Sequence, residues 1–137
     1  MSKDTKRAPI QYHEDDRAQR LQNVYPHIEG QINISYVNST SHVVAWHKHV
    51  LQTDCWVCLK GSFKVGLAKP KEDGTYEVVF EYLSDKHFDM LEIPPGIYHG
   101  YKALEPNSIL MYHLTHKYDP EDDIRATVGA FGEDWAT

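Results

Sequence analysis

The sequence lacks three features that would assign it to a broad class at once. It has no excess of positive charge, because 14 lysines and arginines stand against 20 aspartates and glutamates, for a formal net charge of −6. A nucleic-acid surface normally needs a basic patch, so we expect no nucleic-acid partner. No apolar run approaches the roughly 20 residues of a membrane-spanning helix. The charged start from Met1 to Arg7 is followed by no apolar segment, so we expect neither a secretory signal nor a membrane partner.

Cysteine is also scarce, since Cys55 and Cys58 are the only two in the chain. Their C-x-x-C spacing occurs in redox pairs and in halves of zinc sites. Here no second cysteine pair is present and no helical pattern follows, so we predict neither. In an extended strand, residues three apart point to opposite faces, and we expect two small apolar strand residues. Reduced thiols suit the cytoplasm, which is the location we expect.

A long amphipathic helix is missing as well, and so are internal repeats. From Ile32 onward, short β-rich runs alternate with turn compositions, a pattern typical of all-β sandwiches and barrels. Nine tyrosines, three tryptophans and four phenylalanines fit strands better than a helical bundle. The expected strands cover residues 32–36, 43–49, 55–59, 63–68, 76–83, 88–93 and 108–115.

A chain of 137 residues with 41% hydrophobic residues predicts one domain with a real core. We expect residues 1–9 to be a disordered leader and residues 10–137 to be the single domain. After Pro120, residues 121–126 are expected to form a short helix, with Asp119 as its cap. The predicted fold is therefore an all-β antiparallel barrel or jelly roll with a short C-terminal helical segment.

Two histidine segments about fifty residues apart are the most informative feature that the sequence does contain. The first is His47-Lys48-His49, followed by Asp54 and Gly61, and the second is the proline turn 94–96 that leads to His99. Residues two apart on a strand share a face, so His47 and His49 are expected to project together. Three imidazoles and a carboxylate in one small β-structure indicate a metal site or a proton-transfer site.

Both interpretations are chemically sound. Imidazole and carboxylate groups suit a divalent transition metal, and His47, His49, Asp54 and His99 form the candidate ligand set. Without a metal, the same groups would bind an organic ligand and transfer protons to and from it, since histidine titrates near neutral pH.

The spacing of these residues matches the two motifs of the cupin superfamily, which are HxH, four residues, an acid, six residues and a glycine, and then PxGxxH. From Asp16 to Trp135, the chain resembles one branch of that superfamily, the dTDP-4-dehydrorhamnose 3,5-epimerase-like proteins and the related sugar 3,4-ketoisomerases. The similar segments are 16–18 with DxRG, 44–49 with RGLHxQ, 91–101 with LxIPxGxAHGF, and 118–125 with the ketoisomerase YDxxDYIR. In addition, Tyr112 lies thirteen residues past His99, where the epimerases carry a tyrosine acid.

This resemblance implies a cupin jelly roll that acts on a nucleotide-activated 4-keto-6-deoxy sugar and needs no metal or cofactor. It implies that His47 is the general base that removes a proton next to the C4 ketone. Tyr112 would be the acid that returns a proton to the opposite face of the carbon. His99 or His49 would hydrogen-bond the ketone oxygen and stabilise the enolate. The same resemblance implies a homodimer.

The chain also departs from the family pattern at three positions. Val44 stands where the family has a phosphate-contacting arginine, and Asp54 stands where it has a lysine near the ketone. By spacing, Val128 takes the place of the aspartate that orients the base histidine. The substrate-binding candidates that remain are Arg17, Lys48, Asp54, Tyr118 and Arg125.

Three functions follow, in order of preference. The first is a metal-free epimerase or ketoisomerase of a nucleotide-linked sugar. The second is a metal-dependent cupin enzyme that uses the three histidines and Asp54, because this aspartate fits a metal better than it fits an enolate. The third is a catalytically inactive cupin that binds a sugar nucleotide, which the three departures favour.

Overall fold

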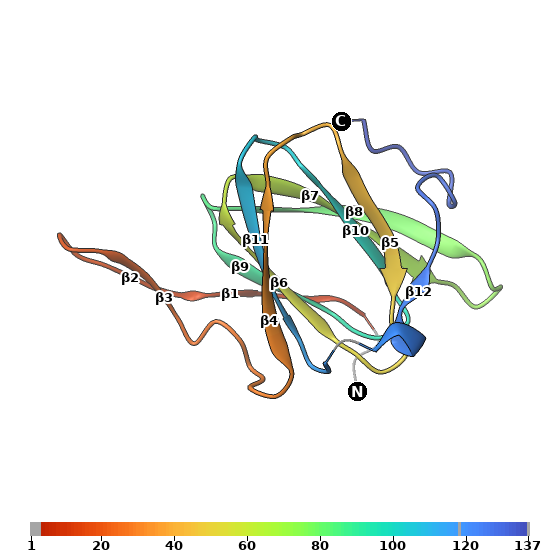
Figure 1. Ribbon diagram of the computed structural model, residues 1–137, viewed down its shortest axis with the longest axis horizontal. Helices are drawn as coiled ribbons and strands as arrows, with labels where there is room; N and C mark the ends of the chain where they lie inside the picture. Colours follow the sequence, from red (N-terminus) through yellow and green to blue (C-terminus); the bar gives the residue numbers. More distant parts are fainter. Residues whose placement is uncertain (1–3, 118, 137) are drawn as a thin grey trace.

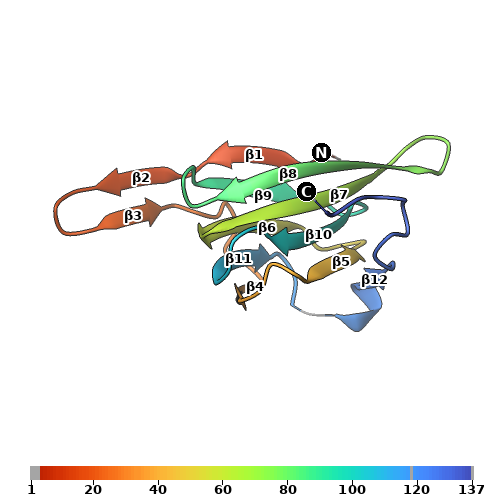
Figure 2. The ribbon, with the colours of Figure 1, turned by 90° about the horizontal axis from the view of Figure 1, so that it is seen from above.

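The computed structural model describes residues 4–117 and 119–136, and they form two facing antiparallel sheets (Figure 1). Sheet I has the strand order β1 (Lys6–Pro9), β9 (Asp89–Ile93), β6 (Asp54–Lys60), β11 (Ser108–Leu114) and β4 (Gln31–Val37). Sheet II has the order β12 (Ile124–Arg125), β5 (Val43–Lys48), β10 (Tyr98–Ala103), β7 (Ser62–Pro70) and β8 (Tyr76–Ser84). Figure 2 shows the layers from above.

The expected jelly roll is confirmed as an architecture, and each of the seven expected strands is present. In the described part of the chain, the two sheets face each other without joining into a closed barrel. The strand β10 was not expected, because Gly100 interrupts its apolar pattern. A Cβ at position 100 would lie 2.7 Å from the carbonyl oxygen of Val44, so glycine permits the close approach of β10 to β5.

The predicted disordered leader is wrong for residues 6–9. These residues form β1, which pairs with β9 at the edge of sheet I. Arg7 fixes this strand, since its guanidinium contacts the carboxylates of Asp89 and Glu81 and donates to the carbonyl of Tyr82. These partners lie more than 70 positions away in the sequence. The local sequence therefore gave no sign of the pairing, and its polar composition alone predicted disorder. Residues 1–3 lie outside the described part.

The predicted C-terminal helix is also shorter than expected. It is a single 3-10 turn, η1 (Pro120–Asp122), and the side chain of Asp119 caps it by accepting a hydrogen bond from the backbone N–H of Glu121. Ile124 and Arg125 then form β12, which pairs with Lys48 and His47 of β5. Pairing with a sheet edge therefore replaces the continuation of the helix.

A hairpin of β2 (Gln11–Glu14) and β3 (Gln19–Gln22) projects from the body of the molecule (Figure 1). Its two strands pair with each other and with no other strand of the described chain. No helix in the described residues is long and apolar enough to cross a membrane.

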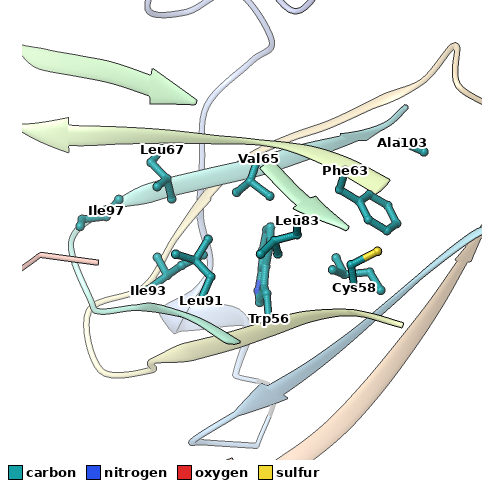
Figure 3. Close-up of a cluster of buried hydrophobic side chains, with 11 residues drawn as sticks. Trp56, Cys58, Phe63, Val65, Leu67, Leu83, Leu91, Ile93, Ile97 and Ala103 are labelled. Carbon is teal, nitrogen blue, oxygen red and sulfur yellow. The ribbon is translucent and has the colours of Figure 1, made fainter. Parts of the chain in front are cut away.

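The core lies between the two sheets (Figure 3). Trp56 and Cys58 of β6 meet Phe63, Val65 and Leu67 of β7 there, and all five are buried. Complete burial of Phe63, Val65 and Leu67 stabilises the fold by roughly 1.5–3 kcal/mol for each side chain. The sequence places these residues at alternate positions, so that one face of each strand enters the core.

Two further apolar layers cover the outer faces of the sheets. Cys55 and Val57 of β6 pack on the outside of sheet I with Leu21 and Tyr25. On the outside of sheet II, the C-terminal segment packs Phe131 and Trp135 against Trp46. The two cysteines therefore lie on opposite faces of β6, as expected, and both are free and buried. Burial raises the pKa of each thiol to about 12. Because the thiolate is the reactive form of cysteine, thiols with so high a pKa are not suited to redox chemistry.

Candidate active site

A cavity of about 260 Å³ opens between the two sheets, and it contains four of the sequence-predicted groups from the histidine segments. His47 and His99 come from β5 and β10 of sheet II, where the register places them directly opposite each other. Asp54 begins β6 of sheet I, and His49 lies just after β5. The lining residues are Val44, His47, His49, Gln52, Asp54, Trp56, His99, Gly100, Tyr101, Leu110, Tyr112, Leu114, Asp119, Asp123 and Arg125.

His47 is held by a carboxylate. Its Nδ1 lies 3.1 Å from Oδ1 of Asp123, so Nδ1–H donates to the carboxylate and Nε2 of the neutral ring keeps its lone pair. The side chain of His47 is 31% exposed, whereas that of Asp123 is 10% exposed. This arrangement gives a partly accessible nitrogen base whose ring orientation is fixed.

The carboxylate of Asp123 is itself fixed on its other side. Oδ2 accepts hydrogen bonds from Nε and Nη2 of Arg125 at 3.0 and 2.9 Å. Burial by itself would raise the pKa of Asp123, but the hydrogen bonds from His47 and Arg125 outweigh burial and hold the pKa below its ordinary value. Asp123 is therefore ionised at neutral pH and favours the Nδ1–H form of His47.

His49, Asp54 and His99 form a second group. Nε2 of His99 lies 3.5 Å from Oδ2 of Asp54, and Nε2 of His49 lies 3.9 Å from Oδ1. The centroids of the two imidazole rings are 5.4 Å apart. Burial lowers the pKa of His99 despite the opposite effect of Asp54, because desolvation disfavours the imidazolium.

Backbone carbonyls set the orientation of both rings in this group. Nδ1–H of His49 donates to the carbonyl of Asp122 at 2.7 Å, and Nδ1–H of His99 donates to the carbonyl of Ile97 at 3.1 Å. Both Nε2 atoms are therefore left to face the carboxylate of Asp54. Since a carboxylate only accepts hydrogen bonds, Asp54 is an acceptor for an N–H at either Nε2.

Asp54 is anchored by two neutral donors. Nε2 of Gln52 donates to Oδ1 at 2.7 Å, and Nε1 of Trp56 donates to Oδ2 at 3.2 Å. The side chain of Trp56 also packs edge-on against the ring of His99. The aspartate is thus a fixed part of the cavity wall between the two histidines.

The second group contains three of the four residues that were predicted as metal ligands. Among the residues that the structure describes, His49, Asp54 and His99 offer ligand atoms that all lie within 4.8 Å of one another, and His47 is not among them. The ring of His47 instead turns to Asp123, because β12 pairs alongside β5 and brings this carboxylate next to it. The predicted ligand set is therefore reduced from four residues to three.

Tyr112 lies on β11, in the sheet opposite His47. Its face is shared with Leu110 and Leu114, as the period-two pattern predicted. The phenol oxygen lies 3.1 Å from Oγ of Ser35 on β4. A second tyrosine, Tyr101 of β10, lines the cavity from the sheet that carries His47, and burial raises its pKa. Sequence reasoning did not identify Tyr101.

The predicted substrate-binding residues are dispersed. Arg125 and Asp54 line the cavity. Arg17 lies in the tip of the β2–β3 hairpin, where it pairs with Asp15 at 2.9 Å. Lys48 lies on the other face of β5, and its Nζ donates to the hydroxyl of Tyr76 at 3.1 Å. Tyr118 falls outside the described residues.

The predicted absence of an orienting aspartate is wrong. The residue at the expected spacing, Val128, is half exposed and does not line the cavity. Asp123, the residue immediately before β12, orients His47 instead. The signal for it was available in the acidic run of residues 121–123, within the segment that resembles the ketoisomerase tail, but nothing in that run indicated a pairing with β5.

Comparisons with known proteins identify a family and relatives with the same fold. A sequence profile described as dTDP-4-dehydrorhamnose 3,5-epimerase matches residues 31–135. Over 85 residues, the chain is 35% identical to the probable low-salt glycan biosynthesis epimerase Agl13 of Haloferax volcanii, an alignment that covers 58% of this chain and 54% of Agl13. The chain thus spans about half the length of the curated relatives it matches.

Two solved structures show the same fold. A dTDP sugar isomerase from Desulfovibrio desulfuricans superposes with a TM-score of 0.83 at 18% identity, covering 96% of this chain and 90% of that one. The sugar 3,4-ketoisomerase QdtA from Thermoanaerobacterium thermosaccharolyticum, in complex with TDP, gives a TM-score of 0.75 at 18% identity, covering 96% and 95%.

Proposed function

Because the chain belongs to the dTDP-4-dehydrorhamnose 3,5-epimerase family, we propose that it is an epimerase or ketoisomerase of a nucleotide-linked 4-keto-6-deoxy sugar. Enzymes of this family act without a metal or other cofactor. The side chains of the cavity must then carry out the proton transfers. The observation that carries the proposal is the hydrogen bond between His47 and Asp123 inside the cavity.

His47 is the general base in this proposal. Its Nε2 takes the proton from the carbon next to the C4 ketone, and the C–H electron pair moves to the ketone oxygen to give an enolate. Asp123 keeps Nε2 available before the transfer and stabilises the imidazolium afterwards, because its carboxylate accepts the hydrogen bond from Nδ1. The proton then passes from His47 to water.

Tyr112 is the proposed acid. It gives its phenol proton to the same carbon, and the phenolate that remains takes a proton from solvent. His47 and Tyr112 belong to different sheets, so a sugar that lies between the sheets has the base on one face and the acid on the other. This placement supports inversion at the carbon. Ketoisomerisation instead needs the proton to move along one face of the sugar, for which His49 is the neighbouring candidate.

His49 and His99 are proposed to stabilise the enolate. A ring with protons on both nitrogens donates from Nε2 to the ketone oxygen, and Asp54 compensates its positive charge. His49 is the preferred donor, because burial lowers the pKa of His99 and disfavours the charged form of that ring. The trio thus replaces the single positive side chain that the family resemblance implied at position 54. Arg125 is the proposed contact for the phosphates, since it is the predicted cation that lines the cavity.

We also propose a homodimer, which uses the outer face of β4. Ile32, Ile34 and Tyr36 point to this face and are 56%, 46% and 70% exposed, on a strand whose other edge has no partner in the described chain. An apolar row at a sheet edge favours association with a second copy. Ile34→Glu should convert the dimer to a monomer by light scattering. Val128→Glu is the matched control, because Val128 is exposed elsewhere.

Two buried free thiols support a reducing location, and we propose the cytoplasm.

The test is proton exchange in deuterated water. TDP-4-keto-6-deoxyglucose, the sugar nucleotide bound to a QdtA variant, is mixed with the protein and followed by NMR. Wild type should incorporate deuterium next to the ketone, and His47→Asn should abolish this incorporation. His87→Asn is the control, since the side chain of His87 is 79% exposed and lies outside the cavity. Binding of the sugar nucleotide without exchange in wild type would show a binding protein instead of an enzyme.

A further inference from the structure

Asp122 is a buried carboxylate to which sequence reasoning gave no role. It is 8% exposed, and it accepts hydrogen bonds from three successive backbone N–H groups. Oδ1 accepts from Val50 at 2.7 Å and from Leu51 at 3.1 Å, and Oδ2 accepts from Gln52 at 3.2 Å. The carboxylate thereby fixes the loop between β5 and β6, which begins at His49.

The same residue contacts His49 through its backbone. The carbonyl of Asp122 accepts the hydrogen bond from Nδ1 of His49 at 2.7 Å. The loop that the carboxylate holds also carries Gln52, whose side chain donates to Asp54 at 2.7 Å. Asp122 is therefore connected to two members of the trio, directly to His49 and through Gln52 to Asp54.

Two consecutive residues thus orient two imidazoles. Asp123 contacts His47 with its side chain, and Asp122 contacts His49 with its main chain while its side chain fixes the loop on which His49 lies. The pairing of β12 with β5 sets the position of both aspartates. A displacement of the loop by about 1 Å is expected to lower the reaction rate, because proton transfer requires the reacting groups to be accurately placed.

We propose that Asp122 is a positioning residue, which keeps Nδ1–H of His49 on its own carbonyl and so directs Nε2 at Asp54 and the ketone oxygen. This proposal rests on the proposed function, since it assigns a task to a residue that does not itself line the cavity. Burial by itself would raise the pKa of Asp122, but the three backbone hydrogen bonds outweigh burial and hold the pKa below its ordinary value. The carboxylate is therefore ionised at neutral pH, in the form that accepts all three hydrogen bonds.

The experiment compares Asp122→Ala and Asp122→Asn with wild type. The expected result for Asp122→Ala is a kcat lower by about 100-fold with KM changed by less than about twofold, because the loop moves His49 away from the reacting oxygen. Asp122→Asn keeps one acceptor oxygen and should recover part of kcat. Asp73→Ala is the matched control, because Asp73 also caps a turn, by accepting from the backbone N–H and hydroxyl of Thr75, but lies outside the cavity.

A second readout separates positioning from general support of the fold. The ¹⁵N NMR spectrum of the free protein reports the tautomer of each histidine. Asp122→Ala should convert His49 from the Nδ1–H form to a mixture of tautomers and leave His47 unchanged, since Asp123 still holds it. Unchanged His49 resonances in a folded Asp122→Ala variant would overturn the proposal, and so would equal changes at both histidines.

The NMR readout also distinguishes failure of the positioning role from failure of the proposed function. If wild type turns over no sugar nucleotide, the proposed function fails, and the tautomer of His49 still shows whether Asp122 sets its orientation. If wild type is active and Asp122→Ala keeps full kcat, the proposed function stands and the positioning role is wrong.

Discussion

The imidazole of His47 and the carboxylate of Asp123 are joined by a 3.1 Å hydrogen bond, although 76 positions separate them in the chain. Adjacent strands make this contact possible, because Arg125 of β12 pairs with His47 of β5. The orienting aspartate, which the spacing placed at position 128, is thereby supplied by the residue immediately before β12. The result is a histidine whose ring orientation is fixed by a carboxylate, and the first prediction concerns its proposed role as the base.

Asp123→Asn is predicted to lower kcat by about 100-fold or more, within the range that general-base catalysis contributes. An amide is neutral and has an N–H₂ group, so it neither stabilises the imidazolium nor fixes the Nδ1–H form. Steady-state kinetics at neutral pH measure the change. Arg125→Gln is the comparison, since it leaves the bond to His47 in place and should mainly raise KM. An Asp123→Asn variant with wild-type kcat would rule out the base–carboxylate pair.

Tyr112→Phe is predicted to slow epimerisation but to allow continued deuterium exchange at the abstracted carbon. The proposed base, His47, and the proposed acid, Tyr112, belong to opposite sheets, so removal of the phenol should block only the proton return. Exchange and product formation are followed together by NMR. The control is Tyr101→Phe, which removes a phenol from the sheet that carries His47. If exchange and product formation are lost to the same degree in Tyr112→Phe, one group performs both transfers.

Chelation is predicted to leave the activity unchanged. The family reaction needs no metal, and the trio of His49, Asp54 and His99 is instead assigned to the enolate. The measurement is elemental analysis of untagged protein together with turnover before and after treatment with a chelator. A stoichiometric transition metal, with activity that is lost on chelation and restored by the metal, would assign these three residues as its ligands.

Acid is predicted to destabilise the fold through Asp122 and Asp123. Both pKa values lie below the ordinary 3.8 in the folded protein, so the unfolded chain binds protons first as the pH falls. Their contribution to the free energy of unfolding is therefore fully present above about pH 5, and it is lost as the pH falls through the ordinary aspartate pKa and below it.

Thermal unfolding at several pH values tests this acid dependence. The difference in Tm between wild type and Asp122→Asn should be largest at pH 7 and should shrink toward pH 3. Asp16→Asn is the control, because Asp16 is exposed in the hairpin loop and its substitution should not alter Tm. A Tm difference that is constant from pH 7 to pH 3 would contradict the assignment to the ionised carboxylate.

The strands and the central cavity groups were predictable because their signals are local. Alternating apolar residues define a strand by period two, and His47 and His99 lie in short segments with recognisable spacing. The turn at Gly61 is likewise local, since its φ of 78° favours glycine. By contrast, the hydrophobic character of β1 and β12 is weak. Strand β1 forms because Arg7 binds the carboxylate of Asp89, and β12 forms because it pairs with the edge of β5. Both partners are distant in sequence.

The sequence by itself therefore determined the all-β fold, the family, and the three histidines and Asp54 as candidate groups, all of which line the cavity. Only the tertiary structure decided how they are divided. It paired His47 with Asp123 and gathered His49, Asp54 and His99 into a separate group. It also turned Lys48 away from the cavity. The reason is physical: residue types set which proton transfers are possible, whereas hydrogen-bond partners that set tautomer and charge come from strand pairing over long sequence distances.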